Sequence, residues 1–172
     1  VDVGQLYLSI VAQARQAVFY RDLAVPDTID GRFEMVVMHL VLVIERLRGE
    51  DKSISAVGQG VFDLFLKDMD RNLSEMGVGD MSIGKRMKKI GRSVYGRFDA
   101  FGPALKTGDA PALAAAIDRN VFAGDPHPGE ANRLAAYALE TAGRLASQTT
   151  SDIEAGRVDW PVPDDVQQGQ DG

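Results

Sequence analysis

Two consecutive amphipathic segments joined by a glycine-containing turn, residues 61–98, constrain the fold of this chain more than any other feature. In the first segment apolar residues recur at helical spacing and therefore share one helix face. They are Phe62, Phe65, Leu66, Met69, Leu73 and Met76. In the second segment the corresponding residues are Ile83, Met87, Ile90, Val94 and Phe98. Each segment is predicted to form a helix that buries one face and exposes the other.

The face of the second helix opposite its apolar residues is basic and consists of Lys85, Lys88, Lys89 and Arg92. The chain as a whole carries a formal net charge of −6. An acidic surface repels polyphosphate, so the chain is not a general nucleic-acid-binding protein. The basic face has two interpretations, a solvated helix surface or a docking surface for an anionic partner, and the sequence leaves both open.

The turn between the two helices is predicted to be a hinge built from Gly77, Gly79 and Asp80. Gly77 is expected in the left-handed conformation that often follows a helix end, because glycine has no Cβ to clash there. The side chain of Asp80 or Ser82 can accept hydrogen bonds from the free N–H groups at the start of the next helix.

The rest of the chain also shows helical patterns. We expect helices over about residues 6–22, 30–48, 112–122 and 130–148, with a further turn at 152–155. The run 35–44 is apolar except for His39 and is about half of the ~20 residues that a membrane-spanning helix needs, so it predicts a buried central helix. The expected fold is an all-α, single-domain bundle of about six or seven helices over residues 1–160, with the hinged pair at its centre. An acidic, disordered tail is expected over residues 161–172.

No sequence motif for catalysis or metal binding is complete. Residues 79–85 have the spacing of a phosphate-binding loop, but Arg86 follows where a hydroxyl is required, and the loop follows a helix rather than a strand. Residues 68–79 begin like a calcium loop but lack its glycine and its final glutamate. The chain has no cysteine and only two histidines, of which His39 is expected to be a hydrogen-bonded core residue. We therefore predict no catalytic residue, metal site or cofactor.

Two long blocks, residues 19–47 and 62–97, closely resemble the ubiquinol–cytochrome c chaperone family. The first block contains V-P-D-T-x-D-G-R-F, and the second contains D-M-D-R-N-L followed by E-M-G-V-G-D. These motifs in this order are specific, and the similarity extends from about Tyr7 to Trp160. Ser74 stands where the family often has Arg, and Val94 stands where an aromatic residue often precedes Y-G-R. These departures concern one charge and one aromatic contact rather than the fold.

The resemblance implies an assembly chaperone rather than an enzyme. Mitochondrial members help newly made cytochrome b enter the cytochrome bc1 complex at the inner membrane, together with a small partner protein and close to the ribosomal exit. This compact chain shows no signal peptide or presequence and resembles a bacterial member, expected in the cytoplasm and peripheral to the inner membrane. Cytochrome b is the expected client. The ribosome, an anionic membrane surface and a small partner protein are further candidate partners.

A chaperone of this kind needs an adaptable apolar surface, and methionine side chains are flexible enough to provide one. We expect a client-binding groove between the hinge and the central helix, formed by Phe65, Met69, Met76, Met81 and Met87. Ordinary core packing of these residues is the alternative. The first block is expected to form a corner near the hinge from Tyr20, Pro26, Asp27, Thr28, Asp30, Gly31 and Arg32. Asp27, Thr28 and Asp30 are all N-cap residue types. In this corner we expect the aspartates to cap backbone N–H groups and Arg32 to pair with a carboxylate.

Two other classes of function stay open at this point. A nucleic-acid- or ribosome-binding module would use only the basic face from Lys85 to Arg92, and its binding would fall steeply with salt. A haem- or quinone-handling enzyme would need ligand or redox residues that the sequence does not reveal.

Overall fold

The computed structural model describes residues 2–49, 51–77 and 79–163, apart from the side chains of residues 53, 54, 80 and 81. Within these ranges the chain forms eight helical segments and no strand. They are α1 (Gly4–Ala14), α2 (Ala17–Arg21), α3 (Ile29–Leu47), α4 (Lys52–Glu75), α5 (Asp80–Thr107), α6 (Ala110–Val121), α7 (Pro128–Ser147) and α8 (Thr150–Glu154). Only α2 and α8 are as short as five residues. The expected all-α fold class is confirmed.

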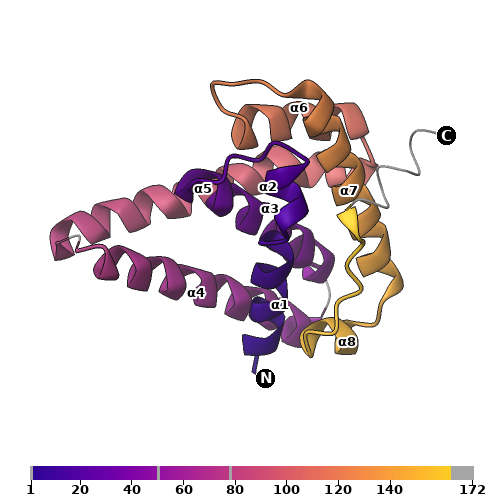
Figure 1. Cartoon of the computed structure of the whole chain (residues 1–172). Coiled ribbons are helices and arrows are strands. Elements are labelled where there is room, and N and C mark those ends of the chain that lie inside the picture. The colour runs from indigo at the N-terminus through magenta and orange to yellow at the C-terminus, as the bar shows by residue number, and fades with distance from the viewer. Residues whose placement is uncertain (1, 50, 78, 164–172) are drawn as a thin grey trace.

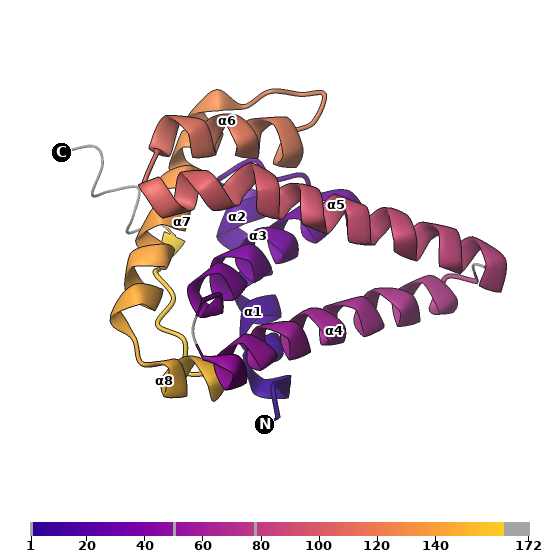
Figure 2. The same ribbon diagram turned by 180° about the vertical axis from the view of Figure 1, so that it is seen from behind.

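Helix α3 forms the centre of the domain. It packs against α1, α4, α5, α6 and α7, and Figures 1 and 2 show it among these helices. Between Met35 and Val43 every residue except Val36 is buried. The prediction that this apolar run is a buried core helix is therefore confirmed. In the part of the chain that the structure describes, no helix is long and apolar enough to span a membrane.

Helices α4 and α5 form a long hairpin that extends away from the rest of the domain, with its turn at the outer end (Figures 1 and 2). The prediction that the hinged pair lies at the centre of the bundle is therefore wrong, because α3 occupies that position. Along the hairpin Phe65, Ile83 and Val94 are buried, while Met69 and Met87 are half-buried. The two apolar faces are thus covered less completely than those of a helix inside the bundle.

The turn of the hairpin contains Gly77 in the left-handed conformation, with φ of +79°. Its N–H group donates to the carbonyl of Ser74 at 3.0 Å, which closes the end of α4 as predicted. Gly79 is the N-cap of α5 and has no side chain to cap with. Asp80 is the first residue of α5, and its side chain lies outside the described part of the chain. Ser82 lies inside the first turn, so it is not the N-cap.

The N-terminal segment differs from the single helix expected over residues 6–22. It is divided into α1 and α2, because Gln16 has an extended backbone with φ of −55° and ψ of 129°. The redirected chain buries Phe19, Leu23 and Val25 against the core. The apolar pattern continues through this break, which is why periodicity alone did not reveal it.

Two polar contacts, one on each arm, hold the hairpin to the rest of the domain. Arg97 on α5 makes a bidentate ion pair with Glu34 on α3, in which Nε donates to Oε2 at 2.8 Å. Glu34 is only 7 % exposed, and its hydrogen bonds raise the pKa of Arg97. On the other arm, the Tyr7 hydroxyl of α1 donates to Oδ2 of Asp68 on α4 at 2.7 Å. These contacts fix where both arms leave the bundle.

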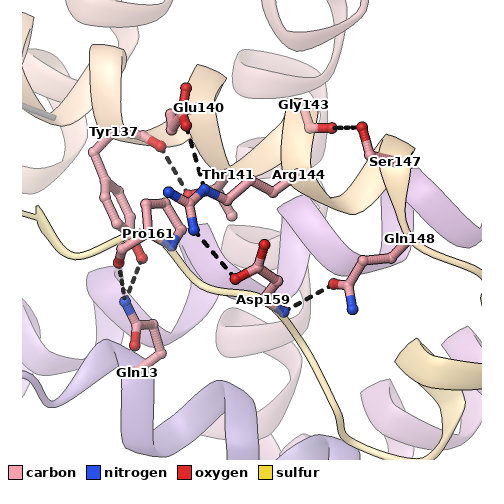
Figure 3. A network of polar contacts seen from close by, with 10 residues as sticks. All are labelled: Gln13, Tyr137, Glu140, Thr141, Gly143, Arg144, Ser147, Gln148, Asp159 and Pro161. Atoms are coloured by element: carbon pink, nitrogen blue, oxygen red, sulfur yellow. Dashed lines mark hydrogen bonds and ion pairs between the residues drawn. The ribbon is translucent and has the colours of Figure 1, made fainter. Parts of the chain in front are cut away.

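A buried polar network joins α1, α3 and α7 to the C-terminal segment. His39 Nδ1 lies 2.7 Å from the carbonyl oxygen of Met35, which can only accept, so Nδ1 carries the proton. Nε2 then accepts from the hydroxyl of Tyr137 at 2.8 Å, and that hydroxyl accepts from Nε2 of Gln13 at 2.9 Å. Gln13 also donates to the carbonyl of Pro161 at 3.2 Å (Figure 3). His39 is therefore the hydrogen-bonded core histidine that the sequence predicts.

The C-terminal segment lies along the domain as far as the structure describes it. Trp160 donates through Nε1 to the hydroxyl of Ser9 at 2.9 Å. Its ring packs edge-on against the ring of His39, with 5.5 Å between the centroids. Pro161 and Pro163 are buried as well, although the sequence predicts a disordered tail from residue 161 onwards. The acidic residues that follow lie outside the described part of the chain.

The end of α7 is tied to the same segment and to α3. The N–H group of Asp159 donates to Oε1 of Gln148 at 2.8 Å, and its carboxylate pairs with Arg144 at 3.2 Å (Figure 3). Arg46 from α3 donates to the carbonyls of Leu145 and Gln148 at 2.9 and 3.0 Å. These bonds satisfy carbonyl groups that would otherwise lack partners at a helix end.

Complete burial lowers the pKa of His39 to about 4, because the imidazolium would lose its hydration. In the unfolded chain a histidine has a pKa of about 6.5. Between these two values the unfolded state binds the proton more readily than the folded state. The free energy of unfolding must therefore fall as the pH is lowered through this window, by about 3 kcal/mol in all from this one group.

We predict that urea unfolding, repeated at several pH values between 6.5 and 4, gives a steeper loss of stability for the wild type than for His39→Gln. The glutamine side chain removes the titrating group but keeps a polar group for Tyr137. The two slopes should differ by about one proton in this window. Parallel slopes would contradict the assigned burial and protonation of His39.

Candidate functional site

A groove of about 920 Å³ lies between the corner that connects α2 to α3 and the middle of α4. It is lined by residues from the α1–α2 connection, α2, the corner, the first half of α3, and α4. These residues are Arg15, Ala17, Tyr20, Arg21, Asp27, Ile29, Arg32, Phe33, Val36, Phe65, Met69 and Asn72. The blocks 19–47 and 62–97 are separated in the sequence, and they meet across this groove.

The floor of the groove is apolar and only partly covered. The rings of Phe33 and Phe65 pack against each other with 6.0 Å between their centroids. Phe65 is fully buried, whereas Phe33, Val36 and Met69 are half-buried. Ile29 stands at the mouth and is 70 % exposed. An apolar ligand could cover surface here that the protein itself leaves in contact with water.

The corner is tight because the backbone folds back on itself between Pro26 and Gly31. A Cβ atom on Gly31 would lie 1.8 Å from the carbonyl oxygen of Pro26, so only glycine fits. Thr28 is the N-cap of α3, and its hydroxyl accepts from the N–H group of Gly31 at 3.1 Å. The expectation that aspartates cap this helix is therefore wrong, since Thr28 fills the capping position. Asp30 is exposed in the first turn, where the helix dipole favours a carboxylate.

Charged and polar groups form the rim of the groove. Arg32 pairs with the carboxylate of Asp27 at 2.8 Å, which confirms the pairing expected for this arginine. The hydroxyl of Tyr20 donates to the carbonyl of Ala14 at 3.0 Å. Burial raises the pKa of Tyr20, so this hydroxyl stays protonated and serves as a fixed part of the wall.

The lining carries more positive than negative charge. Of its three arginines, Arg21 pairs with the neighbouring Asp22 at 2.9 Å and Arg32 pairs with Asp27, so Arg15 is the one without a carboxylate partner in the described part of the chain. A groove with an apolar floor and one uncompensated arginine on its rim suits an apolar segment with a neutral or acidic flank near that arginine. The lining contains no serine, threonine, cysteine, histidine or lysine that could act as a nucleophile. Among the described residues, no group of three or more acidic or histidine side chains could hold a metal ion.

Only two of the five residues expected to form a groove line this one, namely Phe65 and Met69. Met76 is 62 % exposed just beyond α4, and Met87 is half-buried on α5. The side chain of Met81 lies outside the described part of the chain. The five residues therefore do not share one surface. The groove and its corner face the middle of α4, about one to three turns before Gly77, rather than the hinge.

The predicted basic face lies on α5, which contributes no residue to the groove. All four of its side chains are exposed: Lys85, Lys88, Lys89 and Arg92. They form no hydrogen bond or ion pair within the described part of the chain. Their role as a docking face stays a prediction.

Sequence reasoning missed several residues of the groove, including Arg15, Ile29 and Asn72. The spacing of Ile29, Phe33 and Val36 could have identified part of the groove, because it places them on one side of α3. Because α3 is apolar most of the way round, that side could not be told apart from the buried ones by periodicity. Only the tertiary arrangement shows where its cover is incomplete.

A smaller cleft of about 210 Å³ lies between the end of α3 and the two arms of the hairpin. Its apolar lining consists of Ile44, Leu47, Phe62, Tyr95 and Phe98. The guanidinium of Arg48 lies over the ring of Phe98 at 5.4 Å from the centroid. This cleft holds much less volume than the groove at the corner.

Comparison with known proteins identifies the relatives of this chain. Residues 21–160 match the model of a family described as ubiquinol-cytochrome C chaperone. The whole structure is similar to the crystal structure of the Cbp3 homolog from Brucella abortus. The TM-score is 0.86 at 41% sequence identity, with 94% of this chain and 90% of that chain covered. A comparison with curated protein sequences finds no match.

Two glycine-to-alanine substitutions should have opposite effects on the free energy of unfolding, because Gly31 lies in the tight corner and Gly96 lies in open space on a helix. Gly31→Ala should lower the free energy of unfolding by about 2 kcal/mol or more, because the new methyl group collides with the backbone at Pro26. Gly96→Ala should raise it by about 0.5–1 kcal/mol, since that position is exposed in α5 and open to a Cβ. Chemical unfolding of both variants measures these changes. A small effect of Gly31→Ala would show that the corner is looser than described.

Proposed function

The chain belongs to the ubiquinol–cytochrome c chaperone family, and on this premise we propose that it binds newly made cytochrome b and assists assembly of the cytochrome bc1 complex. The observation that carries the proposal is the family match over residues 21–160. Members of this family are chaperones and not enzymes. The groove at the corner agrees with a binding role, because it offers partly uncovered apolar surface next to a charged rim.

The proposed client site is the groove between the corner and α4. Cytochrome b is composed of apolar helices that must be kept from aggregating until they enter the membrane. An exposed apolar helix face can lie in an apolar groove, where each large side chain that becomes buried contributes about 1.5–3 kcal/mol. Phe33, Val36 and Met69 supply half-buried apolar surface for this contact. Met69 adds a flexible side chain that can adapt to different client residues.

The arginines on the rim give the proposed site a preference among client segments. Arg21 and Arg32 are already paired with Asp22 and Asp27, so it is Arg15 that would attract an acidic flank of the client helix and repel a basic one. We therefore expect the groove to take an apolar client segment with its acidic or neutral end towards Arg15.

The proposed place of action is the cytoplasmic side of the bacterial inner membrane, where cytochrome b is inserted. A contact with the ribosome would bring the groove close to client helices as they emerge, and a small partner protein would act as in mitochondrial members. Both contacts are parts of the proposal that the family relationship motivates.

The client site can be tested with one exposed residue and a matched control. Ile29 is 70 % exposed at the mouth of the groove, and Leu8 is 60 % exposed on α1 outside it. Ile29→Asp places a carboxylate in the proposed contact, yet it should not unfold the protein, because the first turn of a helix tolerates acidic residues well. We expect Ile29→Asp to lower the capture of cytochrome b from detergent-solubilised membranes by about tenfold or more. Leu8→Asp should have little effect.

Circular dichroism and unfolding curves establish that both variants are folded. Equal capture by the two variants would move the client site away from the groove while keeping the client. If the wild-type protein captures no cytochrome b at all, the proposed client is wrong.

A further inference from the structure

The first half of α5 carries a dense run of basic residues in a protein with net charge −6. Residues 81–98 contain no acidic residue and six basic ones. Arg97 is one of the six and is bound to Glu34. The other five are exposed and form no hydrogen bond or ion pair in the described part of the chain: Lys85, Arg86, Lys88, Lys89 and Arg92.

The lack of partners on this face contrasts with the rest of the surface, where many arginines pair with a carboxylate. These pairs are Arg21–Asp22, Arg32–Asp27, Arg48–Glu45, Arg144–Asp159 and Arg157–Asp152. Five uncompensated cations within two turns of one helix create a local positive potential that attracts an anionic surface. Charge complementarity therefore defines the partner of this face as anionic.

Two exposed apolar side chains lie near this face in the sequence. Met76 is 62 % exposed at the turn that precedes α5, and Tyr95 is 65 % exposed one turn after the last free cation. Tyr95 follows Lys88 by seven residues and Arg92 by three, so it flanks them on the helix. A helix that combines cations with exposed apolar and aromatic side chains is typical of one that lies in the headgroup region of a bilayer.

The position of this face in the fold also suits a flat partner. The hairpin extends from the bundle, and its turn lies far from α8 and the C-terminal segment (Figures 1 and 2). The first half of α5 belongs to this extended part. It can therefore approach a surface without the bundle standing in between.

We propose that the face of α5 formed by Lys85, Lys88, Lys89 and Arg92, with Tyr95 beside it, docks on an anionic lipid bilayer. A surface for single-stranded RNA would instead interleave its cations with aromatic rings that stack on bases. On this face Tyr95 is the one aromatic residue, and its ring already packs against Phe62 at 6.0 Å between centroids. The observations therefore favour lipid headgroups over RNA as the anion.

The inference concerns a surface separate from the client groove and is tested without any client. The protein is mixed with vesicles of equal parts phosphatidylcholine and phosphatidylglycerol, or with vesicles of phosphatidylcholine alone, and the bound fraction is measured by flotation. We expect binding only to the anionic vesicles, and we expect it to weaken as salt is raised. Each cation near an anionic bilayer is worth about a fivefold gain in affinity.

The decisive comparison uses two double variants with the same change in net charge. Lys88→Glu/Arg92→Glu reverses two cations of the proposed face and should weaken binding to anionic vesicles by about twentyfold or more. Lys52→Glu/Arg119→Glu reverses two exposed cations elsewhere and should change it far less. The four side chains make no polar contact in the described part of the chain, so both variants should fold, which circular dichroism checks.

Three results would overturn the proposal: no binding of the wild type to anionic vesicles, equal losses for the two double variants, or binding to an oligouridylate but not to vesicles. Capture of solubilised cytochrome b measures client binding independently of lipid docking. The Lys88→Glu/Arg92→Glu variant should keep it, so a failure of lipid docking and a failure of the client site can be told apart.

Discussion

The structure depends on the burial of α3. This helix is apolar most of the way round, so it is stable only where other helices cover each of its sides. Helices α1, α4, α5, α6 and α7 provide that cover. The single histidine on the buried run is accommodated because Tyr137 and the carbonyl of Met35 satisfy both of its ring nitrogens. The corner before α3 and the C-terminal segment across α1 complete the enclosure.

The groove is a consequence of the same requirement. The cover of α3 is incomplete at its first two turns, where Ile29, Phe33 and Val36 face a space bounded by α2 and α4. The corner keeps this space open, because the close approach of Gly31 to Pro26 fixes the direction in which α3 leaves the chain before it. The surface proposed for client binding is thus a place where the central helix shows apolar residues to solvent.

The helical pattern of the sequence was sufficient for the fold class, the buried central helix and the glycine turn between the two long arms. It was not sufficient for the break at Gln16, because apolar residues continue on both sides of it. It also gave the wrong picture of the methionines, since helical periodicity shows which residues share a face but not which neighbour covers that face. Phe65 and Met69 reach the groove, while Met76 stands at the free end of the hairpin. The pairing of Arg32 with a carboxylate was predictable, because Asp27 is so near in sequence, whereas the contact of Arg97 with Glu34 depends on tertiary packing alone.

The two proposed binding surfaces lie on different helices and bind different partners. The groove would hold an apolar client segment between the corner and α4, and the cationic face of α5 would hold the protein at an anionic bilayer. Glu34 and Asp68 fasten the two arms of the hairpin to the bundle, so both surfaces belong to one connected framework. A client bound in the groove would then be kept close to the membrane that it must enter.

Site-specific photo-crosslinking in cells that make cytochrome b tests the central claim most directly. A photoreactive residue is placed at Asn72, which is exposed and lines the groove, or at Asn132, which is exposed on α7 and lies outside it. The account predicts a crosslink to newly made cytochrome b from position 72 and none from position 132. A crosslink from position 132 without one from position 72 would contradict the assignment of the groove as the client site.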